Sequence, residues 1–144
     1  MKKLHNYVLI LSVLILAICC TAKTADKNSN DITGKTWKLI EINSQPIQLK
    51  NPKNNPYFKL NMTDMRYEGN AGCNGLGGTF EIKQDIMRIK FNQGISTMMA
   101  CDDLEIEQRF TKALLAADNY SVNGKILSLN KAKMAPLAKF SLQE

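Results

Sequence analysis

Residues 79–91 read TFEIKQDIMRIKF, and this stretch decides the class of fold. Apolar residues recur at every second position on both sides of a turn at Gln84 and Asp85. They are Phe80 and Ile82 before the turn and Met87, Ile89 and Phe91 after it. Because successive side chains of a strand point to opposite faces of a sheet, this period is that of a half-buried strand. The stretch therefore predicts an antiparallel hairpin with one apolar face.

The same alternation appears in other windows of the chain, with turn residues between them. The dipeptide Asn123–Gly124 favours a type I′ turn between two such windows. The windows surround Trp37 and Leu39, run from Phe58 to Met62, flank the Asn123–Gly124 turn from Tyr120 to Leu129, and close the chain from Ala138 to Leu142. Together they predict an antiparallel meander of about eight strands around one core.

Residues 104–117 follow a helical period instead, with apolar residues at helical spacing on one side. Four charged residues fall largely on the other side: Glu105, Glu107, Arg109 and Lys112. Asp102 or Asp103 is placed to cap the start of this helix. Because one amphipathic helix among strands must bury its stripe against a sheet, we expect it to pack across the concave face of a curved sheet. The expected fold class is therefore mainly β (α+β).

The start of the chain has the pattern of an export signal. Lys2 and Lys3 precede an apolar run from Tyr7 to Ile18, as in a secretory signal segment. The run is short for a membrane span, which needs about 20 apolar residues. We therefore expect three parts: a signal segment at residues 1–20, a flexible polar tether at residues 21–31 and one domain at residues 32–144.

The end of the apolar run resembles the lipobox of bacterial lipoproteins, in which a cysteine receives diacylglycerol. Cys19 is the better candidate for this anchor because Leu16 stands three residues before it. Ile18 replaces the small residue that normally precedes the modified cysteine, so Cys20 is the alternative. Acyl chains contribute about 0.8 kcal/mol per buried methylene and would hold the domain at a bilayer. No acidic residue follows either cysteine directly, which favours the outer membrane, and we expect its periplasmic face.

Cys73 and Cys101 are the cysteines left for the domain. In an oxidising compartment they can form a disulfide worth about 3 to 4 kcal/mol, and two buried thiols are the alternative. The one histidine of the chain, His5, lies in the expected signal segment. The domain therefore offers no Ser-His-Asp triad, no Cys-His dyad and no His-ligated metal site, and we expect neither catalysis nor a cofactor.

The formal net charge of +6 comes from scattered lysines. In an exported protein this favours solubility or contact with anionic lipid or polysaccharide. A nucleic-acid partner is not expected, because no arginine-rich patch with interleaved aromatic residues is present.

Two further motifs lie between the predicted strands. The first runs from Gly72 to Gly78 and lacks the Lys and Ser or Thr of a phosphate-binding loop. We interpret its glycines as tight turns and Asn74 as a residue hydrogen-bonded to its own turn. The second motif runs from Ser96 to Cys101, just before the predicted helix. Met98 or Met99 in it is expected to fill the core beneath the helix, and an adaptable binding surface is the alternative.

Together with Trp37 and Leu39 near the start, these motifs resemble the META domain of the HslJ-like lipoproteins. We interpret the matching positions as structural: Trp37, Gly72, Asn74, Gly78, Thr97, Met99 and Ala100. The resemblance implies a curved antiparallel half-barrel of strands with one amphipathic helix packed across its concave face, and no established catalytic site. Such proteins are commonly exported lipoproteins linked to heat stress, novobiocin resistance and the cell envelope, and a secretin pilot lipoprotein is structurally similar.

The resulting hypothesis is a non-enzymatic envelope lipoprotein that supports envelope integrity or stress resistance through protein or lipid contacts. The alternative is a ligand-binding or pilot-like module that holds a hydrophobic tail or a partner segment in the half-barrel. The two differ in whether the hollow is open or filled by the helix. The sequence leaves the partner and the oligomeric state undetermined.

Overall fold

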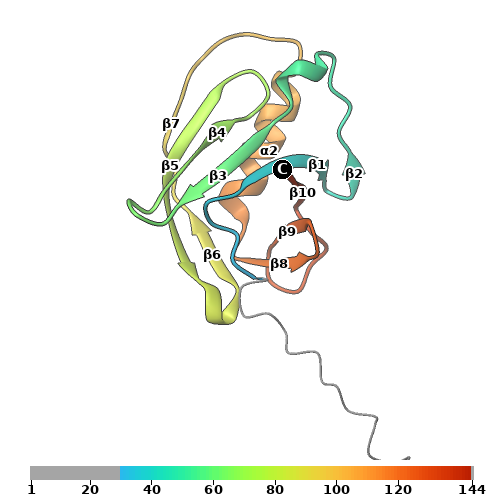
Figure 1. The fold of residues 1–144 in the computed structure, drawn as a ribbon. Coiled ribbons are helices and arrows are strands. Elements are labelled where there is room, and N and C mark those ends of the chain that lie inside the picture. Colours follow the sequence, from blue (N-terminus) through green and yellow to red (C-terminus); the bar gives the residue numbers. More distant parts are fainter. Residues whose placement is uncertain (1–29, 144) are drawn as a thin grey trace, which may run out of the picture.

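The sheet curls into a near-ring in the computed structural model, which describes residues 30–143 (Figure 1). Its strands are β1 (Thr36–Ile42), β2 (Gln45–Pro46), β3 (Tyr57–Asn61), β4 (Arg66–Asn70), β5 (Gly75–Lys83), β6 (Arg88–Phe91), β7 (Ile95–Ser96), β8 (Asn119–Asn123), β9 (Ile126–Asn130) and β10 (Ala138–Gln143). The helical elements are α2 (Leu104–Ala116) and two short 3-10 helices, η1 (Pro52–Asn54) and η2 (Gln84–Ile86). The expected signal segment and both candidate anchor cysteines, Cys19 and Cys20, lie outside the described residues, as does most of the expected tether.

The hairpin predicted from residues 79–91 is present as β5 and β6. Phe80 pairs with Phe91 and Ile82 pairs with Ile89 across it. All four side chains belong to the apolar core or pack against it. The period of two in the sequence therefore identified the paired strands and the face that they bury. It was wrong for Met87, which ends the turn at η2 with a φ of +51°, lies outside β6 and is 37% exposed.

The strands follow one another round the ring in the order β1, β3, β4, β5, β6, β8, β9, β10. Strand β10 then pairs along β1, which brings the last strand beside the first. The two-residue strands β2 and β7 attach to β1 and β5 and bring the sheet to ten strands. The predicted fold class is confirmed, and the sheet reaches further round than a half-barrel. It stops short of a full barrel because β6 and β8 are joined at a single residue pair, Arg88 with Asn119.

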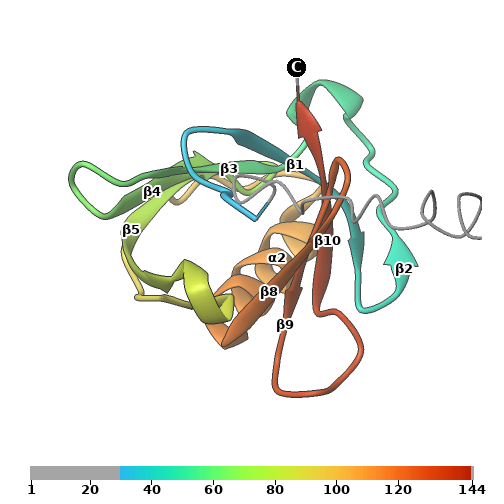
Figure 2. The same ribbon diagram turned by 60° about the horizontal axis from the view of Figure 1, so that its bottom comes forward.

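Helix α2 lies inside the curve of the sheet (Figure 2). Its Phe110 ring lies 5.8 Å from the ring of Phe140, which lies 4.9 Å from Phe58. The Phe58 ring in turn lies 5.8 Å from that of Phe91. These pairs are tilted or edge-to-face, arrangements that the aromatic quadrupole favours. Apolar side chains of the protein itself thus span the hollow from the helix to the sheet.

The residues before β1 are also held against the domain. The indole Nε1 of buried Trp37 donates to the carbonyl of Ile32 at 2.8 Å, and the hydroxyl of Tyr120 donates to the carbonyl of Asn30 at 3.3 Å. These contacts place the start of the described chain beside β1 and β8. No helix among residues 30–143 is long and apolar enough to cross a bilayer.

The start of α2 differs from the prediction. Asp103 occupies the N-cap position but makes no side-chain capping bond. Its carboxylate instead accepts hydrogen bonds from the backbone N–H groups of Lys50, at 2.9 Å, and Asn51, at 3.1 Å. The segment after β2 takes up this carboxylate because its own N–H groups point toward the helix start.

The seam between β6 and β8 is supported by Asp118. Its carboxylate accepts hydrogen bonds from the backbone N–H of Ala132, at 2.9 Å, and from the side chain of Asn119. It also lies 3.5 Å from the guanidinium of Arg88. These two hydrogen bonds and the Arg88 charge hold the pKa of Asp118 below its ordinary value of 3.8.

We expect Asp118→Asn to lower the unfolding temperature slightly at neutral pH and to have no effect in strong acid. A carboxylate whose pKa is lowered by folding stabilises the fold above its unfolded pKa, and this stabilisation is lost as the pH falls through the folded pKa. Thermal unfolding of both proteins between about pH 7 and about pH 2 measures the effect. A difference that does not change with pH would rule out the charge as its cause.

Candidate functional site

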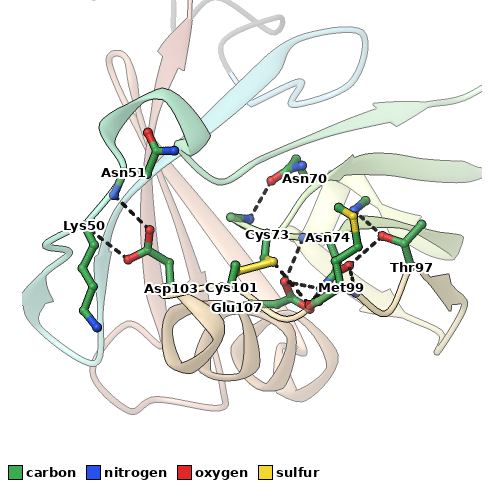
Figure 3. Close-up of a disulfide and its surroundings, with 12 residues drawn as sticks. Lys50, Asn51, Asn70, Cys73, Asn74, Thr97, Met99, Cys101, Asp103 and Glu107 are labelled. Carbon is green, nitrogen blue, oxygen red and sulfur yellow. Dashed lines mark hydrogen bonds between the residues drawn. A yellow bond between two sulfur atoms is a disulfide. The ribbon is translucent and has the colours of Figure 1, made fainter.

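Asn74 lies in the turn before β5 and is 1% exposed. Its Oδ1 accepts hydrogen bonds from the backbone N–H of Met99, at 2.7 Å, and from the hydroxyl of Thr97, at 2.8 Å. Its Nδ2 donates to the carbonyl of Met99 at 3.0 Å and to both carboxylate oxygens of Glu107, at 3.0 and 3.1 Å (Figure 3). The side chain thus joins the loop after β7 to helix α2. Contrary to the prediction, the side chain of Asn74 does not bond to its own turn. Only its backbone carbonyl does so, and it accepts from the N–H of Ala71.

Glu107 is 9% exposed, although its position in the sequence predicted the outer side of α2. Besides the amide of Asn74, its carboxylate accepts the backbone N–H of Asn74 at 2.9 Å. Within residues 30–143, no lysine or arginine forms an ion pair with Glu107. Its negative charge is therefore met by the N–H groups of one asparagine, which explains why the helix turns this residue inward.

A disulfide joins Cys73 and Cys101 beside this cluster, with 6.0 Å between the Cα atoms (Figure 3). The expected disulfide is thus present, and the alternative of two buried thiols is wrong. The backbone N–H of Thr97 also donates to the carbonyl of Gly75, at 3.2 Å. The chain after β7 is therefore fixed to the start of β5 at three alternate positions, Thr97, Met99 and Cys101.

We call residues 95–101 the Met loop. Its apolar side chains face solvent: Met98 is 98% exposed, Ile95 78% and Met99 60%. The prediction that Met98 or Met99 fills the core is therefore wrong. Because both backbone groups of Met99 are bonded to Asn74, this stretch lies along the edge of the fold and its side chains turn outward. The segment between β7 and α2 lies at the opposite end of the domain from the place where the described chain begins, before β1 (Figure 1).

The remaining motif residues have separate roles. Gly72 has a φ of +122°, a conformation that suits glycine, and its N–H donates to Asn70. At Gly78 an added Cβ would lie 2.7 Å from the ring of Tyr67, so a side chain would collide there. Trp37 lies in the core and Ala100 is exposed on the Met loop. The structure thus brings Gly72, Asn74, Thr97 and Met99 to one place and leaves the others outside it.

The chemistry of the cluster is suited to holding the Met loop. The two cysteines of the domain are joined to each other, and both Glu107 oxygens accept bonds from Asn74. In the part of the chain that the structure describes, no group of three or more histidine, cysteine, aspartate or glutamate residues could hold a metal ion. Sequence reasoning missed Glu107, since nothing in the helical pattern distinguishes it from its charged neighbours.

The META domain family matches residues 30–144 of this chain. Curated proteins show no significant match. Two solved structures are similar in fold. An NMR structure of a protein from Burkholderia xenovorans is 17% identical, covers 81% of this chain and 86% of its own, and superposes with a TM-score of 0.62. A crystal structure of a DUF4847 family protein from Bacteroides vulgatus is 15% identical, covers 76% and 93%, and has a TM-score of 0.55.

Proposed function

This chain belongs to the META domain family, and we propose that it is an exported envelope lipoprotein whose domain acts by contact rather than by catalysis. The observation that carries the proposal is the fixed Met loop with its exposed apolar side chains. Burying a methionine side chain is worth about 1.5 to 3 kcal/mol, which Met98 forgoes in the free domain. A surface that is already held in one conformation loses less entropy when a partner binds. The Met loop is therefore the proposed contact site.

The proposed location is the periplasmic face of the outer membrane, with a lipid on Cys19 or, alternatively, on Cys20. The apolar run before these cysteines supports export, and a disulfide between Cys73 and Cys101 suits an oxidising compartment. The start of the described chain, before β1, and the Met loop lie at opposite ends of the domain (Figure 1). With the tether joined at one end of the domain, the Met loop at the other end is accessible to a protein partner.

Three features support a non-enzymatic role. Residues 30–143 contain no histidine, the two cysteines of the domain are paired, and the Glu107 carboxylate is engaged by Asn74. The alternative of a ligand inside the ring finds less support, because the rings of Phe110, Phe140 and Phe58 meet across the hollow. Turnover of an envelope substrate by the purified full chain, abolished by one substitution, would contradict the proposal.

Incorporation of an alkyne-labelled fatty acid in cells tests the anchor. We expect the wild-type chain to be labelled, Cys19→Ala to lose the label and Cys20→Ala to keep it. The reverse pattern would assign the anchor to Cys20. Label retained by the double Cys19→Ala, Cys20→Ala variant would contradict anchoring at this junction.

We expect the double variant Met98→Ser, Met99→Ser to fold normally and to fail in the cell. Exposed residues outside special contacts change stability by within about 0.5 kcal/mol, so the free energy of unfolding should hardly change. Survival of heat or novobiocin in a deletion strain carrying the variant should fall to that of the empty strain. Met134→Ser is the matched control, because Met134 is 65% exposed between β9 and β10. Full protection by the double variant, present at wild-type abundance, would contradict the proposal that the Met loop is the contact site.

A further inference from the structure

A groove of about 600 Å³ lies on the outer face of the sheet, over β3, β4, β5 and β7. Tyr57, Lys59, Arg66 and Glu68 line one side of it, and Ile95, Ser96 and Thr97 line the other. The backbone of β5 forms its floor, where Gly75 and Gly77 have no side chain. Asn74 and Glu107 do not line the groove, but residues 95–97 of the Met loop form one of its edges, and the hydroxyl of Thr97 also donates to Asn74.

Packing does not require glycine at position 75. A Cβ built there would meet one atom, the carbonyl oxygen of Gly69, at 3.9 Å, which is an ordinary contact, and its φ is not positive. At Gly94, by contrast, an added Cβ would lie 1.7 Å from the carbonyl oxygen of Gly77. Gly94 is therefore needed by the fold, whereas the missing side chain at Gly75 has one visible effect, which is to leave the groove open.

The wall on β3 and β4 carries charges that the domain itself does not use. In the register of the two strands, Lys59 on β3 lies opposite Glu68 on β4. Arg66 lies two residues from Glu68 on the same face. Neither Lys59 nor Arg66 has an ion-pair partner within residues 30–143. Two cations without an ion-pair partner at one side of a groove are suited to a carboxylate or phosphate. Hydrogen bonds between ionised groups are stronger than those between neutral groups.

Tyr57 adds an apolar surface beside these cations. It is 38% exposed and faces outward from β3, opposite Asn70 on β4. The face of an aromatic ring packs well on the C–H groups of a sugar ring, while Glu68 can accept a sugar hydroxyl. A groove with an aromatic platform, two cations and one carboxylate thus combines the groups that an acidic sugar needs.

We infer that this groove binds an anionic glycan, with a sugar ring on Tyr57 and the acidic group of the sugar on Arg66 and Lys59. The inference goes beyond the proposed contact through the Met loop and does not depend on it. An exported domain with this groove would hold acidic polysaccharide while Met98 and Met99, which do not line the groove, contact the protein partner.

Calorimetric titration of the detergent-solubilised full chain tests the inference, with trigalacturonate as the acidic probe. We expect it to bind, and to bind at least about tenfold more tightly than neutral galactotriose, because charged hydrogen bonds contribute on this scale. Arg66→Gln and Lys59→Gln should each weaken binding about tenfold for the same reason. Gly75→Val should abolish binding by filling the floor.

Lys133→Gln is the matched control, because it removes a lysine between β9 and β10, away from the groove, and should leave binding unchanged. If Gly75→Val does not fold, Arg66→Gln and Lys59→Gln still decide the question, since both replace exposed side chains. No binding of trigalacturonate, or equal loss with Lys133→Gln, would overturn the inference. Competition by inorganic phosphate at the same concentration as trigalacturonate would overturn the sugar part and leave a plain anion site.

Discussion

Replacing Asn74 with alanine is expected to lower the free energy of unfolding by about 3 kcal/mol or more. The substitution removes the side-chain bonds to Met99, Thr97 and Glu107. It leaves the Glu107 carboxylate buried with only the backbone N–H of residue 74 as a donor. An unsatisfied buried group costs about 1 to 3 kcal/mol, and a charged one costs more. The unfolding temperature should fall by roughly 10 °C for a domain of this size.

A double-mutant cycle shows whether the Glu107 charge is the cause. In the Asn74→Ala background, Glu107→Gln removes the buried charge and should recover part of the lost stability. Asn70→Ala is the matched control, because the side chain of Asn70 accepts one hydrogen bond, from the backbone N–H of Gly72, and its loss should cost about 1 kcal/mol. Urea unfolding measures five proteins: the wild type, Asn74→Ala, Glu107→Gln, the double variant and Asn70→Ala. An Asn74→Ala variant no less stable than Asn70→Ala would contradict the role given to Asn74.

Removing the disulfide is expected to cost about 3 to 4 kcal/mol. The bond closes a loop between cysteines 28 positions apart, which restricts the unfolded chain, and Cys101 is one of the three points that fix the Met loop. The Cys73→Ser, Cys101→Ser double variant and the reduced wild-type chain should therefore unfold at the same, lower temperature. Amide exchange at residues 97–101 should become faster in both. Unchanged unfolding after reduction, with both thiols labelled, would contradict this account.

The part of the fold that could be predicted depends on neighbours in the sequence. Alternation at Phe80, Ile82, Ile89 and Phe91 identified strands because the period of two is a local property of the backbone. The helix, expected at residues 104–117, ends one residue earlier. Strands β2 and β7 have two residues each, too few to show any alternation.

The candidate site could not be predicted because it joins distant parts of the chain. Asn74 and Glu107 are 33 positions apart, and each alone has an ordinary local interpretation, as a turn residue and as a solvated helix residue. Met98 was misjudged for a related reason. An apolar side chain is expected inside unless something holds its backbone at the surface, and here Asn74 holds that of Met99. The pairing of β1 with β10, which brings the sheet round to a near-ring, likewise spans the whole domain.

Photo-crosslinking in cells tests the central claim, that the Met loop is the contact surface of this domain. A photoreactive amino acid at position 98 should capture one envelope protein, and the captured band should weaken in the Asn74→Ala background, where the Met loop loses its support. The same amino acid at position 134, an exposed methionine elsewhere in the fold, should capture nothing specific. Capture from position 98 alone is the predicted result. Equal capture from both positions, or capture from position 134 alone, would contradict the account.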